Sequence, residues 1–166
     1  MKTLLINGSP HARGCTFTAM SIVAEELEKN GVEAEIIHVG NMDIRGCIGC
    51  GRCGETGHCV FNDIVNDIAP KFEQADGLVV GSPVYYAGPN GTLTNLLDRL
   101  FFSTRFDKRM KAGAAVCSAR RAGTTATLDR LNKYFMIAEM PVVSSRYWNM
   151  VHGNSPEQVM QDEEGL

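Results

Sequence analysis

The stretch that decides the fold is "TLLINGSPHARGCT", residues 3–16. A short apolar run is followed by a polar turn with two glycines, and apolar residues at helical spacing come next. Short continuous apolar runs are typical of strands buried on both faces of a parallel sheet. The stretch therefore predicts a strand, a loop and a helix in succession, the repeating unit of an α/β protein.

The same unit recurs along the chain. Further apolar runs predict strands at residues 34–39, 77–81, 113–118 and 141–145. Helical stripes lie between them at 17–27, 64–72, 93–101 and 128–138, and Pro70 is expected to kink or end the second of these helices. The pattern predicts an α/β three-layer sandwich around a five-stranded parallel sheet of order 2-1-3-4-5.

Length and charge limit the function. A chain of 166 residues predicts a single domain, 1–166, with a cysteine-rich loop at 46–60. The net charge is −3, and no stripe of Lys or Arg favours nucleic acid as a partner. No apolar run approaches the roughly 20 residues of a membrane span, and the apolar run at the start is too short for a signal peptide. We expect a soluble, cytoplasmic protein that has no membrane partner and keeps its thiols reduced.

The loop after the first strand has the residues of a phosphate site. Ligands of such sheets bind at the carboxyl ends of the strands. Gly8 and Gly14 allow close approach, and polar groups and positive charge meet the start of a helix, at Ser9, His11, Arg13, Cys15 and Thr16. The loop matches neither the Walker motif nor the dinucleotide fingerprint. A plain strand-to-helix turn is the alternative.

Two further loops follow the third and fourth strands. "GSPVYYAGPNGTL", residues 81–93, is stiffened by prolines and carries adjacent tyrosines, which suit the wall of a site for a flat ring. "SARRAGT", residues 118–124, offers a small polar rim with two arginines. Ordinary packing and a solvated turn are the alternatives for each loop alone. Together with the first loop, they favour one ligand site.

These three loops closely resemble the FMN-binding loops of flavodoxin-like NADPH-dependent FMN reductases and, with the cysteine loop, those of iron-sulfur flavoproteins. The resemblance covers residues 1–153 and implies a flavin-dependent oxidoreductase that forms homodimers or homotetramers. It implies that the FMN phosphate is held by Ser9, His11, Arg13, Cys15 and Thr16. It places Pro83, Val84, Tyr85 and Tyr86 along the isoalloxazine ring, and Ser118, Ala119, Arg120 and Gly123 at its far edge. No side chain is identified as a catalytic acid, base or nucleophile.

The cysteine loop reads C-x2-C-x2-C-x5-C, with Cys47, Cys50, Cys53 and Cys59 as candidate metal ligands. Three cysteines at successive spacings of three are typical of a [4Fe-4S] cluster, whereas structural zinc usually takes two separated pairs. The five residues before Cys59 can span up to about 20 Å, so its return to the same cluster is feasible. Zinc and free thiols stay open as alternatives. Because the loop follows the second strand, we expect it near the flavin loops.

Three functions are compatible with these features. The first is an iron-sulfur flavoprotein that relays electrons between FMN and the cluster, with NAD(P)H or a ferredoxin-like protein as donor. The second is an NAD(P)H-dependent FMN or quinone reductase without a cluster, and the third is a non-catalytic zinc- or FMN-binding module. The segment 155–166 has a helix cap and an acidic first turn, and family members continue through a final helix, so we expect that helix to be missing from this sequence.

Overall fold

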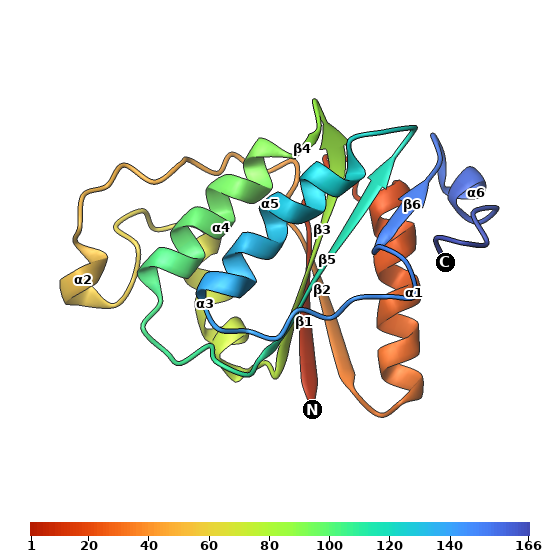
Figure 1. Cartoon of the computed structure of the whole chain (residues 1–166). Helices are drawn as coiled ribbons and strands as arrows, with labels where there is room; N and C mark the ends of the chain where they lie inside the picture. The colour runs from red at the N-terminus through yellow and green to blue at the C-terminus, as the bar shows by residue number, and fades with distance from the viewer.

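The computed structural model describes residues 1–166, and its centre is a sheet with helices on both faces (Figure 1). The strands are β1 (Lys2–Asn7), β2 (Glu33–His38), β3 (Gly77–Tyr85), β4 (Gly88–Pro89), β5 (Ala112–Ala119) and β6 (Met150–His152). Five of them run parallel in the order β2-β1-β3-β5-β6, and the two-residue β4 pairs antiparallel with the end of β3. The predicted order is therefore confirmed.

The helices form two layers. They are α1 (Cys15–Lys29), α2 (Cys53–Thr56), α3 (Ile64–Gln74), α4 (Gly91–Ser103), α5 (Thr124–Ile137) and α6 (Pro156–Val159). In Figure 1, α1 and α6 lie on one side of the sheet and α3, α4 and α5 on the other. The larger core fills the second side, where the stripes of α3, α4 and α5 bury residues such as Phe72, Leu96 and Leu131. The short α2 lies within the cysteine loop and stands apart from both layers (Figure 1).

The predicted fifth strand at 141–145 is wrong in position. Only Val142 makes a ladder contact there, as a single parallel bridge with Gly113. The chain then leaves the sheet, and Tyr147 and Trp148 lie exposed with their rings 4.4 Å apart. Pairing with β5 resumes at β6. The apolar run marks where the edge strand begins, but the excursion moves its main pairing several residues along the chain.

Pro70 was expected to kink or end its helix, and the second of these two outcomes is wrong. Helix α3 continues through Pro70 to Gln74. The proline ring lies on the exposed face, while Val65, Ile68 and Phe72 bury the opposite face. Burial of that apolar face outweighs the loss of one backbone hydrogen bond on the solvent side.

All parallel strands end at the same edge of the sheet, the upper edge in Figure 1. The loops that follow β1, β3 and β5 gather there, and they contain the predicted flavin contacts. At the end of the chain, Ser155 caps α6 as its pattern predicts, accepting a hydrogen bond from the Gln158 amide. No helix of the structure has the length and apolar character needed to cross a membrane.

Candidate functional site

The first and third of the gathered loops are joined by a direct hydrogen bond. Thr16 Oγ1 and Ser118 Oγ lie 2.8 Å apart, and both residues are buried. Thr16 is the second residue of α1, and Ser118 lies near the end of β5. The structure therefore brings together two predicted flavin contacts that are about a hundred residues apart in the sequence.

The β1–α1 loop leaves the start of α1 available to an anion. Gly14, the N-cap, has no side chain to satisfy the first-turn amides, and no acidic residue lies in that turn. Ser9 is buried and fixed, with its amide bonded to Asn7 Oδ1 at 3.0 Å and its hydroxyl accepting from the His11 amide at 3.2 Å. The His11 and Arg13 side chains are exposed. Free amides, a helix dipole and an exposed arginine form a site that suits a phosphate.

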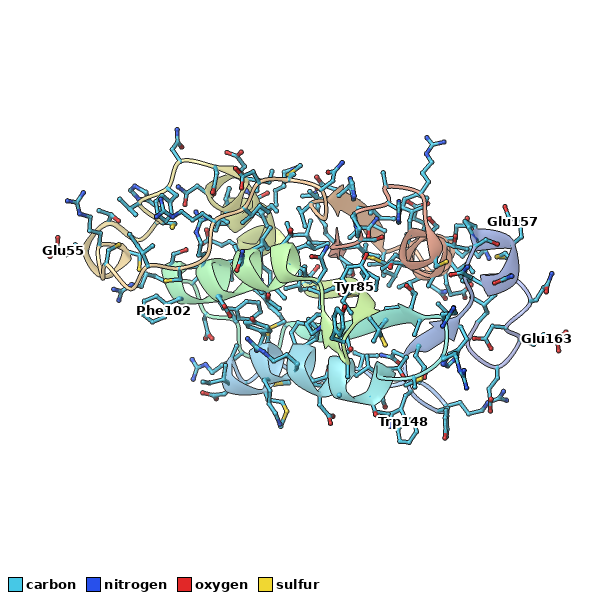
Figure 2. The ribbon with its side chains drawn as sticks, turned by 90° about the horizontal axis from the view of Figure 1, so that it is seen from above. Glu55, Tyr85, Phe102, Trp148, Glu157 and Glu163 are labelled. Carbon is cyan, nitrogen blue, oxygen red and sulfur yellow. The ribbon has the colours of Figure 1, made fainter.

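The turn between β3 and β4 projects two aromatic rings over this edge. Tyr85 and Tyr86 are exposed, and Figure 2, viewed from above, shows Tyr85 near the middle of the molecule. Tyr86 and Ala87 both have positive φ, 51° and 57°, a conformation in which side-chain-bearing residues are strained. Strain of this kind is often found where a loop contacts a ligand.

Gly123 connects this turn to the start of α5. It is the N-cap of α5 with φ of 92°. A Cβ there would lie 2.9 Å from Ala87 Cα and 3.0 Å from Val84 Cγ1. Only glycine allows this approach, which holds the predicted ring wall against the predicted far edge. Pro83 and Val84 are half-buried below the tyrosines, Ala119 is buried, and Arg120 is exposed.

Asn90 connects segments at the carboxyl edge of the sheet, and the sequence did not identify it as a site residue. Its Nδ2 donates to the Gly8 carbonyl at 2.6 Å and to the Gly40 carbonyl at 3.4 Å, while its Oδ1 caps α4 at the Thr92 amide. One buried side chain thus ties the β1–α1 loop to the segment after β2. Nothing in the sequence around Asn90 indicated these long-range bonds.

The four loop cysteines line one small pocket at the far end of α4. Cys47 and Cys50 are exposed, while Cys53 and Cys59 are half-buried. Apolar residues, Arg99 and Ser103 complete the lining, which contains no carboxylate and no imidazole. No group of three or more His, Cys, Asp or Glu side chains in the structure is arranged to hold a metal ion. The pocket therefore collects the thiols without focusing them on one point.

We expected the cysteine loop to lie beside the predicted flavin loops of the same chain. This expectation is wrong. The segment after β2 runs along α4, with the carbonyls of Gly40, Ile44 and Arg45 bonded in turn to three side chains of the helix, Asn90, Asn95 and Arg99. At about 1.5 Å per residue, the nine residue steps from Asn90 to Arg99 carry the loop about 13 Å down the helix axis. Figure 1 shows α2 at the end of the molecule opposite α6, and Figure 2 shows Glu55, a residue of α2, well away from Tyr85.

The remaining cysteines lie apart from this pocket. Cys15 is half-buried at the start of α1, where burial raises the pKa of its thiol, and its Sγ lies 3.7 Å from the Gly153 carbonyl. Cys117 is fully buried in β5, and burial raises the pKa of its thiol to about 12. Cys117 is thus a small core residue.

Alkylation is expected to separate these thiols. A rise from the ordinary value of 9.0 to about 12 lowers the thiolate fraction of Cys117 by about three orders of magnitude, and the thiolate is the reactive form. A short pulse of iodoacetamide on the metal-free protein, read by mass spectrometry, should label Cys47 and Cys50 first and leave Cys117 unlabelled. Equal labelling of Cys117 in the native protein would contradict its placement in the core.

Comparison with known proteins gives a consistent family. Residues 1–155 match the NADPH-dependent FMN reductase family. An iron-sulfur flavoprotein of Methanocaldococcus jannaschii is 33% identical over 174 residues, which cover 100% of this chain and 90% of that protein. An iron-sulfur flavoprotein of Archaeoglobus fulgidus is 33% identical over 169 residues, covering 99% of this chain and 83% of the relative.

Solved structures agree on the fold. The NAD(P)H:quinone oxidoreductase of Methanothermobacter marburgensis superposes with a TM-score of 0.68 at 16% identity, covering 99% of this chain and 93% of that one. A flavodoxin from the domain Archaea superposes with a TM-score of 0.65, also at 16% identity, covering 99% of this chain and 93% of that flavodoxin. With the fold, the matched family and the similar relatives in agreement, the chain belongs to the flavodoxin-like NADPH-dependent FMN reductase and iron-sulfur flavoprotein family and is an FMN-dependent oxidoreductase.

Proposed function

We propose that this oxidoreductase passes electrons between FMN and a [4Fe-4S] cluster held by Cys47, Cys50, Cys53 and Cys59, and that it does so in the cytoplasm. The electron donor would be NAD(P)H or a ferredoxin-like protein. The observation that carries the proposal is the shared pocket of the four thiols, whose lining contains no carboxylate and no imidazole. Thiolates are the ligands that iron-sulfur clusters take.

The residues at the upper edge of the sheet fit FMN. Its phosphate would lie at the start of α1, held by Ser9, Thr16 and the free amides after Gly14, with His11, Arg13 and Cys15 around it. Its ring would lie against Pro83, Val84, Tyr85 and Tyr86, with Ser118, Ala119, Arg120 and Gly123 at the far edge. The exposed tyrosines then cover a ring face and exclude water from it.

The donor set of the cysteine pocket suits an iron-sulfur cluster, because all four candidate ligands are thiols. No group of side chains is already arranged around a metal. The preference for iron-sulfur over zinc therefore rests on the three cysteines at successive spacings of three, since structural zinc usually takes two separated pairs.

FMN supplies the conversion between two-electron and one-electron chemistry when it is bound. One hydride from NAD(P)H carries two electrons, so two single-electron transfers at the cluster balance each hydride. The protein sets the distance between the FMN site and the cluster site. Helix α4 connects them, with Asn90 at the flavin edge and Arg99 at the cysteine pocket.

A homodimer or homotetramer is part of this proposal. Phe102 and Ile137 are 67% and 85% exposed at the far ends of α4 and α5. They border a hollow of about 920 Å³ that also reaches Cys47, and Figure 2 shows Phe102 on the α2 side of the molecule. Exposed aromatic and aliphatic side chains beside a large hollow are typical of contact surfaces between subunits.

Anaerobic purification with metal analysis tests the proposal. The full chain is expected to contain one FMN, together with iron and acid-labile sulfide in a ratio of about four each per chain. Cys50→Ser should lose the iron and keep the FMN, because the two sites are separate. Cys15→Ser, the matched control at the flavin loop, should keep the iron. Zinc in place of iron, or FMN without any metal, would contradict the cluster.

The second candidate is an NAD(P)H-dependent FMN or quinone reductase without a cluster. The matched family and the quinone oxidoreductase with the same fold favour it. In that case NADPH or NADH should bleach the flavin of the metal-free protein, and a quinone should restore its colour at the same rate in wild-type protein and in Cys50→Ser. A rate that falls in the variant supports the relay instead.

A further inference from the structure

We infer that Arg99 is a positioning residue for the cluster. Arg99 raises the electron affinity of the cluster by donating a hydrogen bond to the sulfur of Cys59. The inference rests on the proposed [4Fe-4S] site. Arg99 Nε donates to Cys59 Sγ at 3.2 Å. Of the four loop cysteines, Cys59 alone has a hydrogen bond to its sulfur, so the structure treats one prospective ligand differently from the other three.

The guanidinium of Arg99 is held in place on every side. The residue is 1% exposed, although it carries a full charge. Its terminal nitrogens bind both carboxylate oxygens of Asp63, at 2.7 and 2.8 Å, and the Arg45 carbonyl at 3.1 Å. Its Cζ atom lies over the Phe61 ring, 5.0 Å from the ring centre. A buried, bidentate arginine cannot reorient freely, so the direction of its Nε–H bond is fixed.

Cys59 is fixed in the same way from the other side. Asn66 of α3 binds both polar groups of the Cys59 backbone, accepting from its amide at 3.0 Å and donating to its carbonyl at 2.9 Å. A second bond from Asn66 Nδ2 reaches the Phe61 carbonyl at 3.0 Å. Helices α3 and α4 therefore hold the sulfur of Cys59 and its donor as one rigid unit, independent of the exposed part of the loop.

This arrangement acts on the cluster through the sulfur. A donor hydrogen bond withdraws electron density from a ligating thiolate and stabilises the reduced cluster, which is the more negative state. Asp63 balances the charge of Arg99, so the pair brings little net charge to the pocket. The effect therefore depends on the directed N–H bond rather than on a general positive field.

The test compares Arg99→Lys with Arg105→Lys in the reconstituted holoprotein. Lysine at 99 keeps the positive charge, but a single ammonium group cannot span both Asp63 and Cys59 as the fork does. Arg105 provides the matched control, because it lies at the same loop and donates to the Gly54 carbonyl at 2.5 Å without touching a sulfur. Both variants keep the formal charge, so a difference between them does not come from a change in net charge, and only Arg99→Lys removes a bond to sulfur.

The readout is an equilibrium redox titration followed by electron paramagnetic resonance. At a fixed ambient potential, the ratio of reduced to oxidised cluster is expected to fall about tenfold in Arg99→Lys, the change that corresponds to one charge-assisted hydrogen bond. It should stay at the wild-type value in Arg105→Lys. Equal ratios in wild-type and Arg99→Lys protein, with iron and sulfide retained, would overturn the role of Arg99 and leave the cluster proposal intact. A wild-type protein that takes up no iron and sulfide overturns both.

A second measurement needs no variant at position 99. In wild-type holoprotein labelled with ¹⁵N in its arginines, pulsed electron paramagnetic resonance of the reduced cluster should detect a nitrogen coupling that persists in Arg105→Lys. No coupling to an arginine nitrogen would overturn the inference even if Arg99→Lys fails to fold.

Discussion

Replacing Asp63 by alanine is expected to lower the free energy of unfolding by about 3 kcal/mol or more. The variant would leave the charge of Arg99 buried without its partner, since both terminal nitrogens of Arg99 bind this carboxylate. Burial alone lowers the pKa of Arg99, but the bonds to Asp63 and Cys59 raise it above its ordinary value. Arg99 is therefore charged in the folded protein, and this charge needs a buried partner. Breaking a buried pair on one side is costlier than replacing both partners.

A second contribution comes from the start of α3. Asp63 Oδ1 also accepts from the Val65 amide at 3.1 Å, which caps the helix. Loss of such a cap costs about 1 kcal/mol. Asp63→Asn keeps a capping oxygen and removes the charge, so its destabilisation measures the ion pair without the cap and should lie below that of Asp63→Ala.

Urea denaturation with saturating FMN measures these differences. Asp67→Ala is the matched control, because Asp67 lies in the first turn of the same helix and is exposed. Its free energy of unfolding should fall by less than about 1 kcal/mol. A loss for Asp63→Ala as small as that of Asp67→Ala would mean that the Arg99 pair contributes nothing to stability.

The sequence predicts the buried strands and the helices of this chain but not the path of its edge strand. The buried strands β1, β3 and β5 and the stripes of α1, α4 and α5 follow from apolar periodicity, because burial on a sheet or a helix face repeats along the chain. The split edge strand does not follow. The run at 141–145 has two adjacent valines, as the buried strands do, but most of it lies outside the sheet, with Val143 half exposed.

The candidate site was likewise predicted only in part. Loop composition predicted three loops that suit FMN, and the topology of a parallel sheet brings these loops to one edge, while their contacts to FMN stay a prediction. It could not predict the course of residues 40–59 along α4, which depends on long-range bonds made by Asn90, Asn95 and Arg99. Arg99 had one signal in the sequence. It lies three residues after Leu96, on the apolar face of its helix, where a charge requires a buried partner.

Replacing Gly40 by alanine is expected to weaken FMN binding by about a hundredfold, the size of effect that a misplacement of about 1 Å produces in a site. A Cβ at position 40 would lie 2.0 Å from the Ser9 carbonyl oxygen and 2.4 Å from that of Gly8. Those atoms belong to the backbone of the β1–α1 loop, so the loop itself must move. The same loop carries the phosphate contacts that we propose for Ser9 and Thr16.

Nearby bonds show why the loop cannot move without cost. The Ser9 carbonyl is hydrogen-bonded to His38 Nε2 at 2.7 Å, and the Gly8 carbonyl accepts from Asn90 Nδ2 at 2.6 Å. Displacing the two carbonyls breaks bonds to two different elements, β2 and the start of α4. The displaced loop would then present the first amides of α1 to the phosphate in the wrong geometry.

Gly91→Ala is the matched control for Gly40→Ala. It makes the same chemical change at the first residue of α4, where an added Cβ meets no atom within 4 Å. Titration of each apoprotein with FMN, followed by quenching of flavin fluorescence, gives the two dissociation constants, and circular dichroism checks that both variants are folded. Gly91→Ala should bind FMN as the wild type does. If Gly40→Ala binds equally well, the FMN phosphate does not lie in the β1–α1 loop, because no ligand held by Ser9 and Thr16 could be indifferent to a displacement of that backbone.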